Sequence, residues 1–346
     1  MHLRRLTSLV AVPAGALLAS VALAGCGAQA DAAPAPAAAP AADVAPIRVI
    51  ASFYPLQFVA QEVGGDLVAV DNLTPPGGDP HFVELSPART RDVGEADVVV
   101  TLGGFIAAVD DAIAQRDPEI VVDAADIVQL MPASVTGGHA HDDESSEHAH
   151  EGYSHDEEPD DDHAHAYDTG GYDPHFWLDP VLLAELAVPV ADALSQVDPA
   201  NAEVFAANAA DLVERLHELD AQFAEALAPF AGATMITNHT AFGYLAHRYG
   251  LNQVGITGLD HHIEPSPARM REIAEMARHY GVSTLFYETL VSPRVVQALA
   301  NDLGINAVVI DTLEGLTPAG IEAGDDYITI MLRNLDVLVE GLTVNS

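Results

Sequence analysis

The sequence of 346 residues contains no lysine: its 13 basic residues are all arginines, against 52 acidic residues. The resulting formal net charge of −39 repels nucleic-acid phosphates and anionic lipid headgroups, so we exclude a nucleic-acid-binding role. The same charge attracts cations in general. Cysteine is nearly absent as well, because Cys26 stands alone, and this excludes an intramolecular disulfide.

The N-terminus carries a short apolar run, Leu9–Leu23, which follows Arg4 and Arg5 and ends in small residues before Cys26. A basic start, a short apolar stretch and small residues at the end are typical of a secretory signal peptide, here residues 1–25, and the run is too short for a membrane span. Leu-Ala-Gly-Cys resembles the bacterial lipobox, which implies a diacylglycerol on Cys26. We expect no other segment to be apolar enough to span a bilayer.

Residues 26–46 are rich in alanine and proline, a composition that favours an extended tether and cannot form a core. Two acyl chains anchor a protein stably. The sequence therefore predicts a lipid-anchored protein on the extracytoplasmic face of the cytoplasmic membrane.

From Ile47 onwards, short β-rich runs alternate with helical segments. The predicted strands are Ile47–Phe53, Leu67–Leu73, Val98–Leu102, Ile120–Asp123, Thr234–Thr237, Gln253–Ile256, Thr284–Tyr287 and Ala307–Ile310. Continuous Val/Ile/Leu runs between helices indicate parallel strands buried on both faces. We predict an α/β fold with two lobes, residues 47–197 and 231–346, each with a parallel sheet, and a metal cleft between them.

Residues 198–230 are predicted to form one long rigid helix that joins the lobes. Asp198-Pro199 supplies an N-cap and a proline at the first helical position, and the helix should run over Ala200–Leu227, about 40 Å. Its apolar stripe is Val204, Leu212, Leu216, Leu219, Phe223 and Leu227. The preceding helix, Pro180–Val197, should be kinked or split by Pro189.

The segment 139–168 contains twelve acidic residues, no Lys or Arg and almost nothing apolar. Such a composition predicts a mobile loop. Its histidines are His139, His141, His148, His150, His155, His163 and His165. Histidine-rich tracts bind metal ions, so we expect auxiliary metal binding here; the alternative is an ordinary acidic loop.

An Asp-Pro-His-Phe motif occurs twice and provides His81 and His175. Proline stiffens the turn before each imidazole, and Asp79 and Asp173 could accept hydrogen bonds that orient the turn. A third candidate, His239, follows a predicted strand, at the end where open α/β sheets place their ligands. The helix Ala241–Tyr249 should start directly after it.

The chain resembles bacterial solute-binding protein family 9, the metal-binding lipoproteins of ABC importers. The resemblance rests on Gly78–Pro87, Asp173–Pro180, Thr237–Leu245, Glu264–Pro267, Phe286–Glu288 and Asp311–Leu316. It implies that His81, His175 and His239 bind one metal ion. For the fourth ligand, Glu314 is the first choice, Asp311 the second and a water the third.

Histidine as third ligand is typical of the zinc binders of that family, whereas the manganese binders have glutamate, in line with the preference of imidazole for Zn²⁺. The sequence thus predicts a monomeric zinc-binding lipoprotein, not an enzyme, that delivers Zn²⁺ to an ABC permease in the membrane. The alternatives are a manganese or iron binder of the same family, a zinc-dependent hydrolase, which lacks support because no HExxH motif or general base is found, and an adhesin or zinc buffer that uses only the 139–168 loop.

Five further histidines follow the signal peptide and lie outside the motifs quoted above. Glu288 could support His239 instead of binding metal. We expect His217, His247 and His279 to face solvent from helices. His261 and His262 depart from the family pattern, and they either are exposed without a role or face the rim of the cleft.

Overall fold

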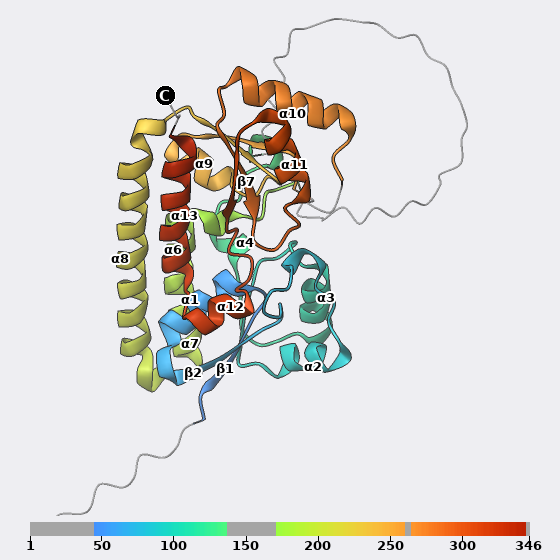
Figure 1. Ribbon diagram of the computed structural model, residues 1–346. Helices are drawn as coiled ribbons and strands as arrows, with labels where there is room; N and C mark the ends of the chain where they lie inside the picture. The colour runs from blue at the N-terminus through green and yellow to red at the C-terminus, as the bar shows by residue number, and fades with distance from the viewer. Residues whose placement is uncertain (1–44, 137–170, 260–263, 344–346) are drawn as a thin grey trace, which may run out of the picture. The chain divides into compact units, whose positions relative to one another are not determined.

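Two parallel four-stranded sheets form the framework of the computed structural model, which describes residues 45–136, 171–259 and 264–343 (Figure 1). The first sheet contains β1 (Ile47–Ala51), β2 (Val68–Asn72), β3 (Val98–Thr101) and β4 (Val121–Asp123), in the order β2-β1-β3-β4. The second contains β5 (Thr234–Thr237), β6 (Asn252–Gly255), β7 (Thr284–Glu288) and β8 (Asn306–Ile310), in the equivalent order β6-β5-β7-β8. The predicted α/β class with two parallel sheets is confirmed, and the lobe boundaries stay a prediction.

Helices connect successive strands, as parallel pairing requires. Before the long helix they are α1 (Tyr54–Gly64), α2 (Pro87–Glu95), α3 (Ala107–Arg116), α4 (Ala124–Ile127), α5 (Ala133–Thr136), α6 (Pro180–Ala184) and α7 (Ala187–Val197). The long helix is α8 (Ala202–Leu227). After it come α9 (Gly243–Tyr249), α10 (Pro267–His279), α11 (Arg294–Leu303), α12 (Pro318–Ala323) and α13 (Tyr327–Leu342).

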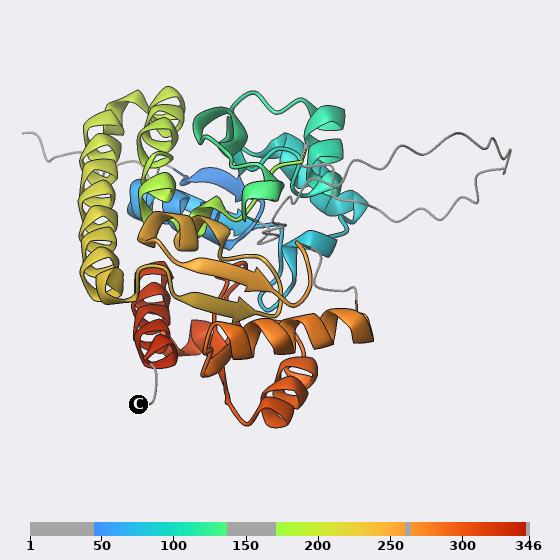
Figure 2. The ribbon, with the colours of Figure 1, turned by 90° about the horizontal axis from the view of Figure 1, so that it is seen from above.

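Helix α8 packs against α1, α6 and α7, which precede it, and against α13, which follows it (Figures 1 and 2). The predicted long helix is confirmed, and Asp198 caps the short 3₁₀ turn before it by accepting from the Ala200 N–H. One stripe position was wrong: Val204 is exposed and the adjacent Phe205 is buried. Adjacent helical residues point about 100° apart, so the start of a stripe shifts easily by one residue.

The stretch Pro180–Val197 is split, as predicted, between α6 and α7. The break falls at Glu185 and Leu186, because Pro189 has no N–H to donate to the Glu185 carbonyl and its ring crowds that carbonyl. By length and composition this stretch is apolar enough to cross a membrane, contrary to our expectation. Half of it is buried and both helices pack against α8, so it forms part of the core.

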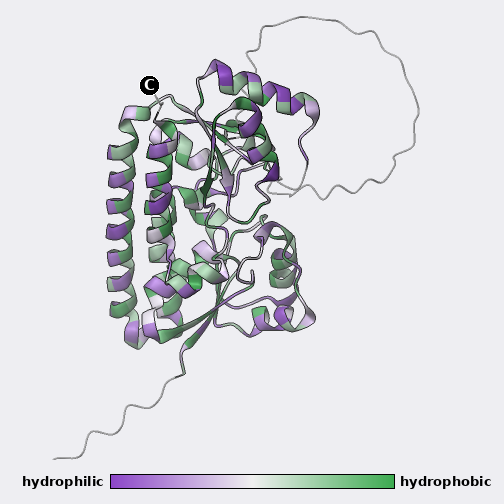
Figure 3. Ribbon diagram, viewed as in Figure 1, coloured by the Kyte–Doolittle hydropathy of each residue, from purple (hydrophilic) through white to green (hydrophobic). Residues whose placement is uncertain are grey.

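Two clusters of buried apolar residues hold the sheets in place. The larger extends from β1 and α1 through α7 and α8 to α13. The smaller lies between the second sheet and α10 and α11, with Ile236, Ile273 and Val296 fully or almost fully buried (Figure 2). Along the helices hydrophobic residues alternate with hydrophilic ones, as expected for elements with one buried face (Figure 3).

Candidate metal centre

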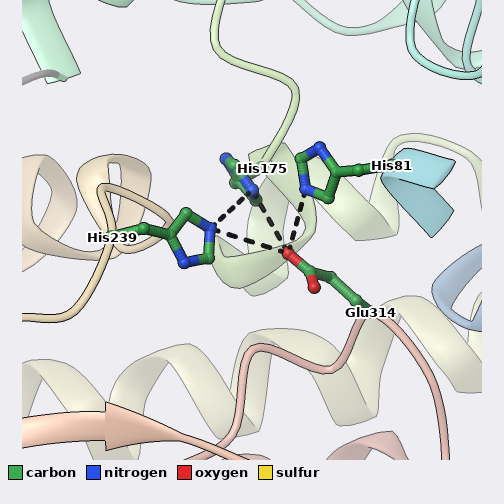
Figure 4. Close-up of side chains that lie close together, drawn as sticks. All are labelled: His81, His175, His239 and Glu314. Atoms are coloured by element: carbon green, nitrogen blue, oxygen red, sulfur yellow. Dashed lines mark hydrogen bonds and ion pairs between the residues drawn. The ribbon is translucent and has the colours of Figure 1, made fainter. Parts of the chain in front are cut away.

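Four buried side chains converge at one point: His81, His175, His239 and Glu314. One ligand atom from each lies within 4.8 Å of all the others (Figure 4). The Oε1 atom of Glu314 is 3.4 Å from Nε2 of His81, 3.3 Å from Nε2 of His175 and 3.8 Å from Nε2 of His239. Within the described parts of the chain this is the one such group of potential ligands.

The spacing of these atoms matches a tetrahedral zinc site. With Zn–N and Zn–O bonds of about 2.0–2.1 Å, two ligand atoms of a regular tetrahedron lie roughly 3.3–3.4 Å apart. The Nε2 atoms of His175 and His239 are 3.5 Å apart, and the distances to Glu314 bracket the same value. Four of the six pairwise spacings are therefore close to those of a tetrahedral site, and all six lie within 4.8 Å.

The His81 imidazole is held by the turn that the sequence predicts. Asp79 caps the 3₁₀ turn Pro80–Phe82 and its Oδ1 accepts from the His81 N–H at 2.9 Å. Pro80 occupies the first position of that turn, where its fixed φ is favourable. The side chains of His81 and Glu314 are each 2% exposed and those of His175 and His239 are fully buried, so the whole cluster is shielded from solvent.

The His175 imidazole is oriented by Asp173. One carboxylate oxygen, Oδ1, accepts from the His175 N–H at 2.9 Å and lies 2.7 Å from Nδ1 of the ring. An acceptor at Nδ1 keeps a proton on that nitrogen, so in the neutral ring the lone pair of Nε2 faces the cluster and is available to a metal ion. The supporting role expected of Asp173 is therefore present in the structure.

His239 lies at the carboxyl end of β5, separated from the strand by Asn238. Its Nδ1 lies 2.6 Å from Oε1 of Glu288, the last residue of the neighbouring strand β7. The Glu288 N–H donates to Oδ1 of Asn238 at 3.0 Å, so a second hydrogen bond joins Glu288 to the segment that carries His239. Helix α9 starts at Gly243, two residues later than predicted, and His239 lies in the bend at residues 238–240 that precedes it.

Glu314 lies in the connection between β8 and α12. Leu313 adopts a left-handed conformation (φ 55°), and its N–H donates to Oδ1 of Asp311 at 2.8 Å. The other carboxylate oxygen of Asp311 accepts from the Thr289 hydroxyl. Asp311, the second choice for fourth ligand, is thus engaged with the loop and is not part of the cluster, whereas Glu314 is.

Burial and mutual contact set the charges of the cluster. Burial lowers the pKa of His81 below 6.5. Burial would also lower the pKa of His175, but Asp173 and Glu314 outweigh it and raise that pKa to about 10. For Glu314, burial favours the neutral acid, yet hydrogen bonds from His175 and His81 hold its pKa well below 4.5. Glu314 is therefore an anion facing three imidazoles, a donor set suited to a divalent cation.

The remaining predicted residues divide into two groups. His217, His247 and His279 are exposed on α8, α9 and α10, as expected. The other predicted sites lie outside the described residues: Cys26, the loop histidines 139, 141, 148, 150, 155, 163 and 165, and His261 and His262.

Three residues around the centre were missed by sequence reasoning. The Trp177 Nε1–H donates to the Thr312 carbonyl at 2.8 Å, and the hydroxyls of Tyr244 and Tyr327 donate to the carbonyls of Asp173 and Trp177. All three bonds join residues on opposite sides of α8 in the sequence. Because the acceptors are backbone carbonyls, which every residue has, the sequence carries no signal for these pairs.

Comparison with known proteins gives consistent matches. The zinc-binding protein AdcA of Streptococcus pyogenes is 33% identical over 296 residues, which are 84% of this chain and 55% of that protein. The chain thus spans about half the length of that relative. The high-affinity zinc uptake system protein ZnuA of Bacillus subtilis is 30% identical, over 87% of this chain and 89% of the relative.

A solved structure agrees with these matches. The Zn(II)-bound ZnuA-like domain of Streptococcus pneumoniae AdcA superposes with a TM-score of 0.68 at 28% identity, over 86% of this chain and 99% of that one. Residues 49–341 match the family described as zinc-uptake complex component A, periplasmic. The chain therefore belongs to this family, ZnuA, within solute-binding protein family 9.

Proposed function

We propose that this protein is an extracytoplasmic, high-affinity zinc-binding lipoprotein that delivers Zn²⁺ to an ABC importer, and that His81, His175, His239 and Glu314 bind the ion. The observation that carries the proposal is the approach of four buried ligand atoms to within 4.8 Å of one another. Relatives named for zinc binding and zinc uptake support the same cargo.

The donor set favours zinc over manganese or iron. Three imidazole nitrogens and one carboxylate oxygen form a four-coordinate set, whereas Mn²⁺ prefers more oxygen ligands and a higher coordination number. With Glu314 charged and the histidines neutral, a bound Zn²⁺ would leave a net charge of about +1 in the cavity. The buried site tolerates this charge because Asp173 and Glu288 are hydrogen-bonded to the outer ring nitrogens.

The same geometry argues for binding and release and against catalysis. A catalytic zinc ion keeps one position open for water or substrate, whereas the four proposed ligands, all almost completely buried, would fill every position of a tetrahedral ion. The hydrolase alternative predicts zinc-dependent turnover of a test ester by the purified protein. Our proposal predicts none.

Membrane attachment and partner complete the proposal. Cys26 would carry the lipid anchor, and the monomeric protein would dock to an ABC permease in the same membrane. The histidines of segment 139–168 would collect zinc and transfer it to the buried site. Zinc uptake by the host after deletion of the gene should fall, and should recover with the wild-type chain but not with a His239→Ala chain.

Calorimetric titration with Zn²⁺ tests the site. His81→Ala and His239→Ala should each weaken binding by more than about 100-fold, because each removes a ligand and not merely the support of one. His217→Ala removes an exposed histidine from α8 and is the matched control, expected to bind as the wild type does. Deletion of residues 139–168 should lower the stoichiometry and leave one tight site. If tight binding disappears with that segment, the buried cluster is not the zinc site.

A further inference from the structure

The Tyr244 hydroxyl bonds to two stretches of chain that precede α8. Tyr244 lies on α9 and is 2% exposed. Its hydroxyl donates to the Asp173 carbonyl at 2.8 Å and accepts from the Met131 N–H at 2.7 Å. Burial raises the pKa of Tyr244, so the hydroxyl keeps its proton at neutral pH and acts as donor and acceptor at once.

The two stretches are also paired with each other. The Asp173 N–H donates to the Met131 carbonyl and the Ala133 N–H to the Gly171 carbonyl, each at 2.9 Å. Pro132 and Tyr172 form an antiparallel bridge between these bonds. Tyr244 therefore bonds to both paired stretches, to Met131 on one and to Asp173 on the other. Asp173 is also the residue that begins the His175 turn.

Asp173 connects these paired stretches to the metal centre. Its carboxylate accepts from the N–H and the Nδ1 of His175, so the position of the Asp173 backbone sets the position of the His175 ring. Both Asp173 and His175 are completely buried. A shift of the Asp173 carbonyl would move the imidazole with it.

Tyr244 is equally well connected to His239, which precedes it by five residues. The residues between them are fixed: Ala241 and Phe242 are fully buried, and the Thr240 N–H donates to the Gly258 carbonyl. One short route of covalent and hydrogen bonds thus joins the two histidines whose Nε2 atoms lie 3.5 Å apart.

We propose that Tyr244 is a positioning residue of the metal centre: its hydroxyl holds Asp173, and through Asp173 the His175 imidazole, at a fixed place relative to His239. A phenylalanine would fill the same apolar space, so the hydroxyl is needed for its two bonds and not for packing. The effect of the Tyr244 hydroxyl on zinc affinity rests on the proposed function, whereas its effect on the position of the His175 ring is independent of that function.

The test compares Tyr244→Phe with Tyr249→Phe. Tyr249 lies on the same helix, and its hydroxyl bonds to Asp220 on α8 and to neither of the two backbone groups that Tyr244 contacts. Tyr244→Phe loses both hydrogen bonds of its hydroxyl and Tyr249→Phe loses one, so a general loss of stability affects both variants. Three readouts are taken: Zn²⁺ affinity by competition with a chelator, the absorption spectrum of bound Co²⁺, and the crystal structure of the metal-free protein.

We expect Tyr244→Phe to weaken zinc binding by about 10-fold, at the lower end of what loss of an outer partner of a metal ligand causes. The Co²⁺ bands should shift, and His175 and His239 should be more than 3.5 Å apart at Nε2 in the metal-free crystal, with none of these changes in Tyr249→Phe. An unchanged separation and spectrum in Tyr244→Phe would overturn the proposal. If the wild type itself binds no zinc, the proposed function fails, and the crystal structures still decide whether Tyr244 positions His175.

Discussion

The Nδ1 atom of His239 lies 2.6 Å from Oε1 of Glu288, and both side chains are buried. The same relationship links His175 to Asp173 at 2.7 Å. In each pair a carboxylate is hydrogen-bonded to Nδ1 of the imidazole, and Nε2 therefore faces Glu314. Two of the three imidazoles are therefore oriented for metal binding before any ion arrives. Less side-chain conformational entropy is then lost when an ion binds.

Glu288→Gln should weaken zinc binding by about 10- to 100-fold, because the amide can still accept from Nδ1 but no longer carries the charge that makes the imidazole a stronger ligand. Calorimetric or chelator-competition titrations measure the change. Glu214→Gln makes the same change on the exposed face of α8 and is the control, expected to bind zinc with unchanged affinity. Equal affinities for the two variants would show that Glu288 has no influence on His239.

Much of the fold follows from local sequence. Continuous Val/Ile runs such as Val98–Thr101 identify strands because parallel strands are buried on both faces, and Pro189 identifies the break between α6 and α7. The strand Thr234–Thr237 is predicted to the residue. Helix starts are less certain: α9 begins after a turn that no proline or capping side chain marks in advance.

The site shows where sequence reasoning stops. Asp-Pro-His turns and a histidine after a strand are local patterns, so His81, His175 and His239 can be proposed from the chain alone. The choice between Glu314 and Asp311 depends on the loop conformation around Leu313, and the contacts of Tyr244 depend on distant backbone positions. Neither property is encoded in a short stretch of residues.

Zinc binding should release about one proton near neutral pH. The pKa of His175 is raised to about 10 in the metal-free protein, so between its ordinary 6.5 and about 10 the folded site carries a proton on His175 that the ion has to displace. The dissociation constant should therefore fall about tenfold per pH unit in this window. Calorimetry in buffers of different ionisation enthalpy measures the released proton.

The same shift has a consequence for metal-free stability. A raised histidine pKa stabilises the folded state fully below 6.5, and this contribution is lost as the pH rises through about 10. Asp173→Asn removes the charge that raises the pKa, so this variant should release less than one proton near neutral pH. A binding enthalpy of the wild type that does not vary with the buffer contradicts a protonated His175.

Arg248→Met should destabilise the protein by about 1–2 kcal/mol at neutral pH, a value reduced for partial solvent exposure. The Arg248 Nε lies 2.6 Å from Asp220 and 3.2 Å from Asp179, the residue that caps α6 beyond the His175 turn. Its hydrogen bond lowers the pKa of Asp220, so the stabilisation is present above the ordinary carboxyl pKa and is lost as the pH falls through the lowered one.

Urea unfolding at neutral and acidic pH measures this loss, and the difference between wild type and Arg248→Met should shrink below about pH 4. Arg91→Met is the control, since Arg91 is exposed on α2 and bonds to the Pro87 carbonyl. A difference that persists unchanged at low pH would mean that Arg248 stabilises the fold by packing and not through its ion pairs.

Leu313 combines two opposing effects, and substitution separates them. Its side chain is fully buried, so truncation to alanine should cost about 2–5 kcal/mol, whereas its left-handed backbone (φ 55°) costs a residue with a Cβ about 1–2 kcal/mol. Packing is the larger effect, so both Leu313→Ala and Leu313→Gly should be destabilised. Glycine, free of the backbone penalty, should be the more stable of the two by about 1 kcal/mol.

At Leu212, buried inside α8, the order must reverse, since glycine in a helix is about 1 kcal/mol worse than alanine. Urea unfolding of the four variants measures both differences. If the alanine variant is more stable than the glycine variant at both positions, the left-handed conformation of Leu313 next to Glu314 carries no backbone penalty.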